Sequence, residues 1–575
     1  MKKIKYIIMI AMVLILGSCG EEFLDIKPKD QLTVEGFYRN AEEIRMVTGA
    51  IYGQSWFDAN DKFLWAAGDG LPGDLYQDYE DEGQLFFHTF TDQNTVILQG
   101  WRGLYRVVAA ANTVINGMPA VASDNGAPES AINGGLGEAR FLRATAYFFL
   151  TEFWGDVPVI SDAAADVANN EITPLKNTRE TIYDFIIGDL EFAAENLPLS
   201  DQPGRVTSWS AKGMLAKVYL TKGQSTQDAN DFTMAKQYAQ DVIENSGLSL
   251  LPDYADLFTI QGNNNPESLF ALQWTSGSYG VGNSRQAVFA RGSNLTGISE
   301  GWGGYKSATL SFMDNVASNA GSTGAVPNID KRRSAIYMQL GDHYSDMHAE
   351  FGGYTYNIYY EYPEDYADPL LAGTNEGAAP LLNNIKKYVL GTANDVGTSI
   401  SNQAVPLNQY ILRLADVYLV YAEAAIGPGS SVTDATNDPA ALEYYHMVRD
   451  RGVVQANGEL TARKTSITFE DVFNERRVEF GMEGINWFDV KRRFYRNPNE
   501  AIQYLNTQRT ADRYRIIDNG SDNETRNTWA AYELDPTVSP LIATEEKMFL
   551  PIPASEVTVN PNLAADIESE PYTTE

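Results

Sequence analysis

Apolar residues recur along much of this chain at the three- and four-residue spacing of amphipathic helices. One such stripe, in GEARFLRATAYFFLTEFWG, contains Leu142, Ala146, Phe149, Leu150 and Phe153. Two more lie in WSAKGMLAKVYLTKG, where Gly223 is a suitable helix stop, and in residues 414–425. We expect similar helices near residues 40–53, 100–117, 179–196, 232–245, 439–450 and 468–481. The pattern predicts a mostly α-helical protein built from paired helices.

Small residues within these helices indicate how they pack. Ala144 and Ala146, and likewise Ala422, Ala424 and Ala425, resemble the close helix crossings of tetratricopeptide hairpins, although no consensus repeat recurs. We therefore expect a tetratricopeptide-like helical-repeat scaffold without strict repeats. Between about 250 and 405 the periodicity gives way to stretches rich in Gly, Asn, Tyr and Trp, such as TSGSYGVGNSRQAVFARGSNLTG. A long irregular region in a compact protein is usually functional.

The N-terminus predicts export and lipid attachment. A basic MKKIK precedes an apolar run from Ile7 to Leu16, which is too short to span a bilayer. Gly17 and Ser18 then lead into Cys19, the only cysteine of the chain. This arrangement resembles the bacterial lipoprotein box, whose cysteine is acylated and becomes the first mature residue. The alternative is an ordinary secreted protein with a buried cysteine.

The charge of the chain argues against a nucleic-acid ligand. The net charge is -33, and loss of the leader with Lys2, Lys3 and Lys5 would make it -36. No stretch rich in Lys and Arg offers the basic face on which nucleic-acid binding depends. With 44% hydrophobic and 11% aromatic residues, the chain has the composition of a folded protein with many rings available.

Metal and cofactor motifs are weak or absent. A single cysteine excludes a thiolate zinc cluster, and His343 and His348 in GDHYSDMH are not at the HExxH spacing. An ordinary polar loop is therefore favoured there over a metal site. Residues 68–73, GDGLPG, match GxGxxG but lack the surrounding βαβ unit that dinucleotide binding requires. We expect neither a metal nor a cofactor.

A run of glutamates has two interpretations. Glu475, Glu479 and Glu483 recur every four residues in NERRVEFGMEGINWFDVKRR, with Arg476, Arg477, Lys491 and Arg492 nearby. One interpretation is a catalytic carboxylate cluster on one helix face. We favour an ion-paired structural helix, because like charges at this spacing are tolerated only beside cations.

Aromatic residues in the Gly-rich loops are the best candidates for ligand binding. Flat rings suit sugars, whose C–H faces stack on them while carboxylates, amides and guanidinium groups take the hydroxyls. The alternative is that the rings form core beneath long loops. The candidate ligand-binding residues are Trp65, Asp69, Trp274, Tyr279, Arg291, Trp302 and Tyr305.

Six further stretches occur in order along the chain: CGEEFLDIKPKDQLT, WRGLYRVVAAANTVI, GEARFLRATAYFFLTEFWGDVPVI, YILRLADVYLVYAEA, NERRVEFGMEGINWFDVKR and LPIPASEVTVNPNL. Together they resemble the SusD/RagB family of nutrient-binding surface lipoproteins. The resemblance implies four tetratricopeptide-like helical pairs, a variable loop-rich ligand face and no catalysis. It also implies a SusC-like TonB-dependent transporter as partner, over which the lipoprotein closes as a lid. Glu21 and Glu22 match the family's acidic surface-export signal.

These inferences divide the chain into five segments. We expect a signal peptide (1–18), a lipidated tether (19–39), an N-terminal helical region (40–250), a loop-rich ligand-binding region (251–405), and a C-terminal helical region with its tail (406–575). The expected function is non-catalytic capture of a glycan at the outer membrane, facing the cell exterior. A neutral glycan such as a β-glucan is favoured, because cations are sparse in the candidate loops. The alternatives are a receptor for peptides or other nutrients and a secreted glycoside hydrolase.

Overall fold

The computed structural model describes most of the chain beyond the N-terminal segment. The described residues are 37–77, 79–290, 295, 306–321, 327–339, 342–356, 383–400, 403–508, 514–516, 532–534 and 541–573. Cys19, Glu21 and Glu22 therefore lie outside them, as do Arg291, Trp302 and Tyr305. In the described part, no helix combines the length and apolarity needed to cross a membrane.

Helices make up most of the described structure, as the periodicity predicts. The longer helices are α2 (Ala41–Gly49), α4 (Thr95–Asp124), α5 (Glu129–Trp154), α7 (Arg179–Asn196), α8 (Ser208–Thr226), α9 (Ala229–Asn245), α12 (Leu310–Ala320), α16 (Leu414–Ala424), α17 (Pro439–Gly452), α18 (Phe469–Glu479), α19 (Asn486–Arg496) and α20 (Pro498–Asn506). The shorter ones are α3 (Glu80–Phe86), α6 (Ala163–Ala168), α10 (Arg285–Phe289), α13 (Arg333–Ile336), α15 (Ala393–Val396) and α22 (Ala554–Val559).

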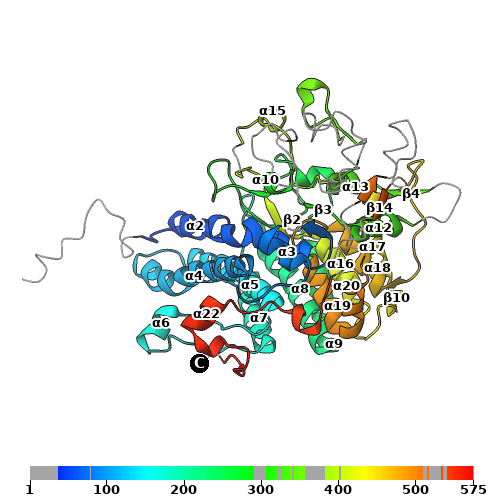
Figure 1. The fold of residues 1–575 in the computed structure, drawn as a ribbon. Helices are drawn as coiled ribbons and strands as arrows, with labels where there is room; N and C mark the ends of the chain where they lie inside the picture. Colours follow the sequence, from blue (N-terminus) through cyan, green and yellow to red (C-terminus); the bar gives the residue numbers. More distant parts are fainter. Residues whose placement is uncertain are drawn as a thin grey trace, which may run out of the picture.

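Consecutive helices pack as hairpins into one layer. α5 packs between α4 and α7, α8 between α7 and α9, and α16 against α9 and α17 (Figure 1). Local signals begin these helices. The side chain of Asn94 accepts the free N–H groups of Val96 and Ile97 at the start of α4, and Thr207 with Ser210 forms a capping box at the start of α8. α8 continues past Gly223 to Thr226, so this glycine lies within the helix and does not end it.

The described strands form short antiparallel pairs, five of which involve the loop-rich region. They are β1 (Leu75–Gln77) with β3 (Lys306–Ala308), β2 (Ser268–Leu272) with β9 (Gln409–Arg413), β4 (Asn328–Asp330) with β11 (Val453–Gln455), β5 (Tyr337–Met338) with β8 (Asn384–Ile385), β6 (His343–Tyr344) with β7 (Tyr354–Thr355), β10 (Ala435–Thr436) with β12 (Ile467–Thr468), and β13 (Tyr514–Ile516) with β14 (Tyr532–Leu534). Figure 1 shows α10, α13 and α15 beyond one side of the helical layer. The pairings β2–β9 and β4–β11 join this region to the C-terminal helices.

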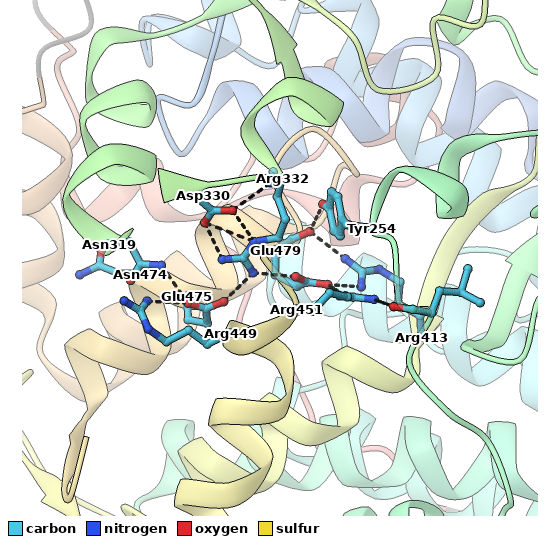
Figure 2. A network of polar contacts seen from close by, with 12 residues as sticks. Tyr254, Asn319, Asp330, Arg332, Arg413, Arg449, Arg451, Asn474, Glu475 and Glu479 are labelled. Atoms are coloured by element: carbon cyan, nitrogen blue, oxygen red, sulfur yellow. Dashed lines mark hydrogen bonds and ion pairs between the residues drawn. The ribbon is translucent and has the colours of Figure 1, made fainter. Parts of the chain in front are cut away.

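A buried ion network lies where these regions meet, and Figure 2 shows the part of it around Arg332, Glu475 and Glu479. It contains five cations and five carboxylates, so its formal charges balance. Its side chains are at most 8% exposed. We call the buried ion network the set Arg332, Lys387, Arg413, Arg449 and Arg451 with Glu267, Asp330, Glu475, Glu479 and Glu483.

The network confirms the structural interpretation of the glutamate run but corrects two details. α18 ends at Glu479, and Glu483 follows in a turn where Met482 has φ +66°, so the three glutamates do not share one helix face. Their cations come from other elements. Glu475 and Glu479 pair with Arg332 at 2.5 and 2.8 Å, and Glu483 pairs with Lys387 at 3.0 Å. Because these carboxylates are enclosed, no substrate can reach them in this structure.

Candidate functional site

An exposed tyrosine on a braced aromatic cluster is the best candidate for a ligand contact. The side chain of Tyr279 is 54% exposed, and its ring meets Phe57 edge-on with centroids 4.8 Å apart and planes 86° apart. Trp274 also packs edge-on against Phe57, with ring centroids 6.1 Å apart. We call Phe57, Asp61, Trp274 and Tyr279 the Tyr279 site. It presents a flat ring to solvent above a buried aromatic base.

Polar groups in and beside the same site fix the position of the tyrosine and offer further hydrogen-bonding atoms. The hydroxyl of Tyr279 donates a hydrogen bond to Asp61 Oδ2 at 2.6 Å. Partial burial, together with this carboxylate, raises the pKa of Tyr279, so the phenol remains a donor. The indole N–H of Trp274 has no hydrogen-bond partner among the described residues. At the rim, Asp58 pairs with Arg106 at 2.5 Å.

Two irregular helical segments position Asp61, the residue that binds the Tyr279 hydroxyl. Asp61 lies in η4 (Ala59–Phe63), and η5 (Ala66–Gly70) follows directly; both have the wide π-helical hydrogen-bond pattern. π-Helical turns are rare and occur frequently at functional sites. η5 lies against the turn that contains Glu483. A Cβ on Gly68 would be only 1.9 Å from the carbonyl oxygen of Gly484, so only glycine allows this approach.

Arg285 connects the end of the Tyr279 loop with η4 and with the turn that contains Glu483. This side chain is fully buried at the start of α10, and its guanidinium donates to the backbone oxygen of Met482 at 3.4 Å and to Asn60 Oδ1 at 3.5 Å. Asn283, two residues earlier, forms a two-way backbone bridge with Val405 at 2.9 and 3.1 Å. The loop that carries Tyr279 is therefore anchored to η4, to the Glu483 turn and to residue 405.

Two of the predicted ligand residues are interior residues. Trp65 is fully buried and donates its indole N–H to the backbone oxygen of Asp61 at 2.7 Å, so neither ring face is open to a ligand in this structure. Lys306 lies over the same ring at 4.8 Å. Asp69 is also fully buried, and burial raises its pKa well above the usual range. Both predictions are corrected for one reason: Trp65 and Asp69 lie in or next to the helical segment η5, which tertiary neighbours cover.

Of the other predicted ligand residues, Trp274 and Tyr279 are described, whereas Arg291, Trp302 and Tyr305 lie outside the described residues. Tyr279 is exposed, whereas Trp274 is only 4% exposed and serves as support. Sequence reasoning missed Phe57 and Asp61. The acidic and aromatic stretch FDANDKF was the available signal, but its contact with Tyr279 spans more than 200 residues.

Metal binding finds no support in the described residues. They contain no group of three or more His, Asp or Glu side chains placed to hold an ion. The ring of His343 instead contacts the hydroxyl of Thr355 at 2.9 Å. His348 lies in a tight turn, where its backbone N–H binds Asp395.

Comparisons with known proteins identify relatives along most of the chain. A family model described as "SusD family" matches residues 266–566, and one described as "Starch-binding associating with outer membrane" matches residues 22–220. A "SusD-like protein" of Bacteroides ovatus is 34% identical over 580 residues, which cover 98% of this chain and 97% of the relative.

Solved structures share the fold. A crystal structure with a xylogluco-oligosaccharide has a TM-score of 0.76 and 33% sequence identity, covering 92% of this chain and 99% of the other. A surface glycan-binding protein from Bacteroides thetaiotaomicron, in complex with laminarihexaose, has a TM-score of 0.61 and covers 92% of this chain and 99% of its own. At 18% identity, the second likeness concerns the fold alone.

Proposed function

The chain belongs to the SusD family, and on that premise we propose that it is a non-catalytic glycan-binding protein of the outer membrane. It captures an oligo- or polysaccharide and delivers it to a SusC-like TonB-dependent transporter. The Tyr279 site is the single observation that carries the binding assignment. An exposed ring, fixed by the hydrogen bond from its hydroxyl to the buried carboxylate of Asp61, offers the stacking surface that sugars require.

A neutral glycan fits the site better than an anionic one. Asp58 and Asp61 lie at or beside the tyrosine, and the neighbouring Arg106 is already paired with Asp58. An anionic sugar would meet these carboxylates without a free cation among the described residues of the site. The relative of known structure that is 33% identical was solved with a xylogluco-oligosaccharide, whose glucan backbone is uncharged. This supports a β-glucan as the ligand class.

Surface attachment is the second part of the proposal. Cys19 carries the lipid anchor, and Glu21 and Glu22 direct the protein to the outer face of the membrane. The family model that matches residues 22–220 is described as associating with the outer membrane, which supports this placement. A body attached by one end can close over a transporter while it keeps its ligand face outward.

Titration calorimetry of the mature chain tests the binding assignment. We expect heat of binding with xylogluco-oligosaccharides or laminarihexaose. We expect Tyr279→Ala to weaken that binding about tenfold, because a stacked ring contributes about 1 kcal/mol and the Asp61 contact is lost as well. Tyr279→Phe retains the ring and should lose less.

Leu199→Ala is the matched control. Leu199 is 63% exposed between α7 and α8, and its truncation should leave affinity unchanged. A protein that binds none of a broad oligosaccharide panel would refute glycan capture. Normal binding by Tyr279→Ala would refute only the assignment of this site. Release of reducing ends by the purified protein would instead favour a hydrolase.

A further inference from the structure

Phe351 is a large apolar side chain that the fold displays to solvent. It is 79% exposed at the end of η8 (Ala349–Phe351), in the turn between β6 and β7. Single exposed apolar residues are common on surfaces and need no explanation by themselves. The backbone that presents this one is unusual, and it is the reason to consider a function.

The turn around Phe351 is strained and firmly held. His348 has φ +52°, a left-handed conformation that costs a residue with a Cβ about 1 kcal/mol, and Gly352 and Gly353 have φ +90° and +104°. A Cβ on Gly353 would lie 2.6 Å from the ring of His343, so the turn is also tightly packed. Strain of this kind persists where surrounding bonds determine the conformation, and it is concentrated at functional sites.

The carboxylate of Asp395 supplies those bonds. It accepts the backbone N–H groups of His348 at 2.8 Å and Ala349 at 2.9 Å, and that of Thr392 at 2.8 Å. Three backbone donors on one carboxylate fix the turn relative to α15. Phe351 is therefore presented by a rigid element, so little conformational entropy is lost when a ligand contacts it.

Polar side chains lie beside the turn. Glu350 is exposed next to Phe351, and its carboxylate accepts a long 3.4 Å hydrogen bond from the amide of Asn394. The turn therefore places a carboxylate and an amide beside an exposed ring. It fits the C–H face and the hydroxyls of a sugar better than it fits a purely apolar partner.

Hydrogen bonds tie the helix that follows the Tyr279 loop to the segment that leads into the turn's support. Gln286 lies in α10, the helix that follows the Tyr279 loop, and its side chain forms hydrogen bonds with residues 390 and 391. Its amide donates to Gly391 O at 3.1 Å and accepts from Leu390 N at 2.7 Å. Thr392 and Asp395, which hold the Phe351 turn, follow directly. The two exposed rings are thus mounted on one bonded framework.

We propose that Phe351, with Glu350 and Asn394, is a second sugar contact, used by glycan chains long enough to extend beyond the Tyr279 site. This inference rests on the proposed function and adds a preference for long chains. A short oligosaccharide fills the Tyr279 site alone, whereas a polysaccharide also reaches the Phe351 turn. Because the turn is already rigid, the second contact adds affinity without a conformational change.

The test compares chain lengths in the full mature protein. Xyloglucan and laminarin polymers, and the shortest oligosaccharides of each that bind, serve as probes in titration calorimetry. We expect Phe351→Ala to weaken polymer binding about fivefold and to leave short oligosaccharides unchanged. Phe351→Trp should bind polymers about as tightly as the wild-type protein does, because tryptophan also offers a flat face for stacking. Val559→Ala is the matched control, since Val559 is equally exposed at 79% on α22 and should change neither affinity.

The outcomes separate this inference from the proposed function. If the wild-type protein binds the probes and Phe351→Ala binds polymers equally well, the second contact is refuted while glycan capture stands. If Phe351→Ala weakens short and long ligands by the same factor, the turn belongs to the first site and the length preference is refuted. If the wild-type protein binds no probe, the proposed function fails, and the inference fails with it.

Discussion

Arg413→Met tests how strongly the buried ion network joins the loop-rich region to the C-terminal helices. The Arg413 side chain is 1% exposed, and its guanidinium donates to Glu267 at 2.9 Å, to Glu479 at 2.5 Å and to Glu483 at 2.8 and 3.1 Å. Methionine fills much of the same volume but removes the charge. Five buried carboxylates would then share four cations.

The loss of stability depends on which cations remain paired with each carboxylate after Arg413 is replaced. Glu479 keeps Arg332 and Arg451, Glu267 keeps Arg451, and Glu483 keeps only Lys387. Loss of one partner from a buried ion pair costs about 3–5 kcal/mol, because the remaining charge stays desolvated. We expect a loss of about 3 kcal/mol, since the remaining cations partly compensate. Typical domains are stable by about 5–15 kcal/mol, so this loss is measurable.

The pH dependence has a defined sign. Burial alone would raise the pKa of Glu479, but Arg451, Arg413 and Arg332 lower it below the usual range. A lowered pKa contributes stability above the unfolded value near 4.5, and this contribution is lost as the pH falls. Removal of Arg413 reduces that contribution. The deficit of the variant should therefore be largest at pH 7 and shrink as the pH approaches 3.

Urea unfolding followed by tryptophan fluorescence, at pH 7 and pH 3, measures both effects. The double variant Arg413→Met with Glu483→Leu removes one charge of each sign, so its cost should be smaller than the sum of the two single losses. A loss below about 1 kcal/mol for Arg413→Met, or strict additivity in the double variant, would refute the reasoning.

Two other predictions concern the support of the Tyr279 site and the membrane anchor. Gly68→Ala places a Cβ 1.9 Å from Gly484 O, so we expect about 2 kcal/mol lower stability and weaker glycan binding, measured by thermal unfolding and calorimetry. An unchanged melting temperature would contradict the close approach. Cys19→Ala should abolish labelling by palmitate and leave glycan affinity intact, and persistent labelling would exclude Cys19 as the acylated residue.

The helical scaffold could be predicted because its signal is local. Each amphipathic stripe depends on residues within a few turns, and α7 begins at Arg179 and ends at Asn196, in agreement with the pattern. Where long-range contacts decide, the prediction was incomplete. α12 lies in the region expected to be irregular, and Glu483 left the helix because residues 480–484 form a turn with left-handed Met482 and Gly484.

The candidate binding site could be predicted only as a class of residue in a class of loop. Aromatic rings among glycines selected Tyr279, which is exposed, but the same reasoning selected Trp65, which the surrounding structure covers. Composition does not reveal which segment packs over a loop, because that segment is distant in sequence. Phe351 was missed for the opposite reason. Its exposure depends on the conformations of His348, Gly352 and Gly353, and on bonds to Asp395, none of which the sequence pattern shows.

The composition of the buried ion network limits how ligand specificity can change within this architecture. Glu267, Asp330, Arg332 and Lys387 come from the loop-rich half, whereas Arg413, Arg449, Arg451 and the glutamates of residues 475–483 come from the helical half. Transplanting the loops of a relative with another glycan preference would therefore replace four of the ten charged residues of this network. Successful exchange requires the incoming loops to carry the matching ions, so recognition can diversify freely only at positions that do not contribute to this network.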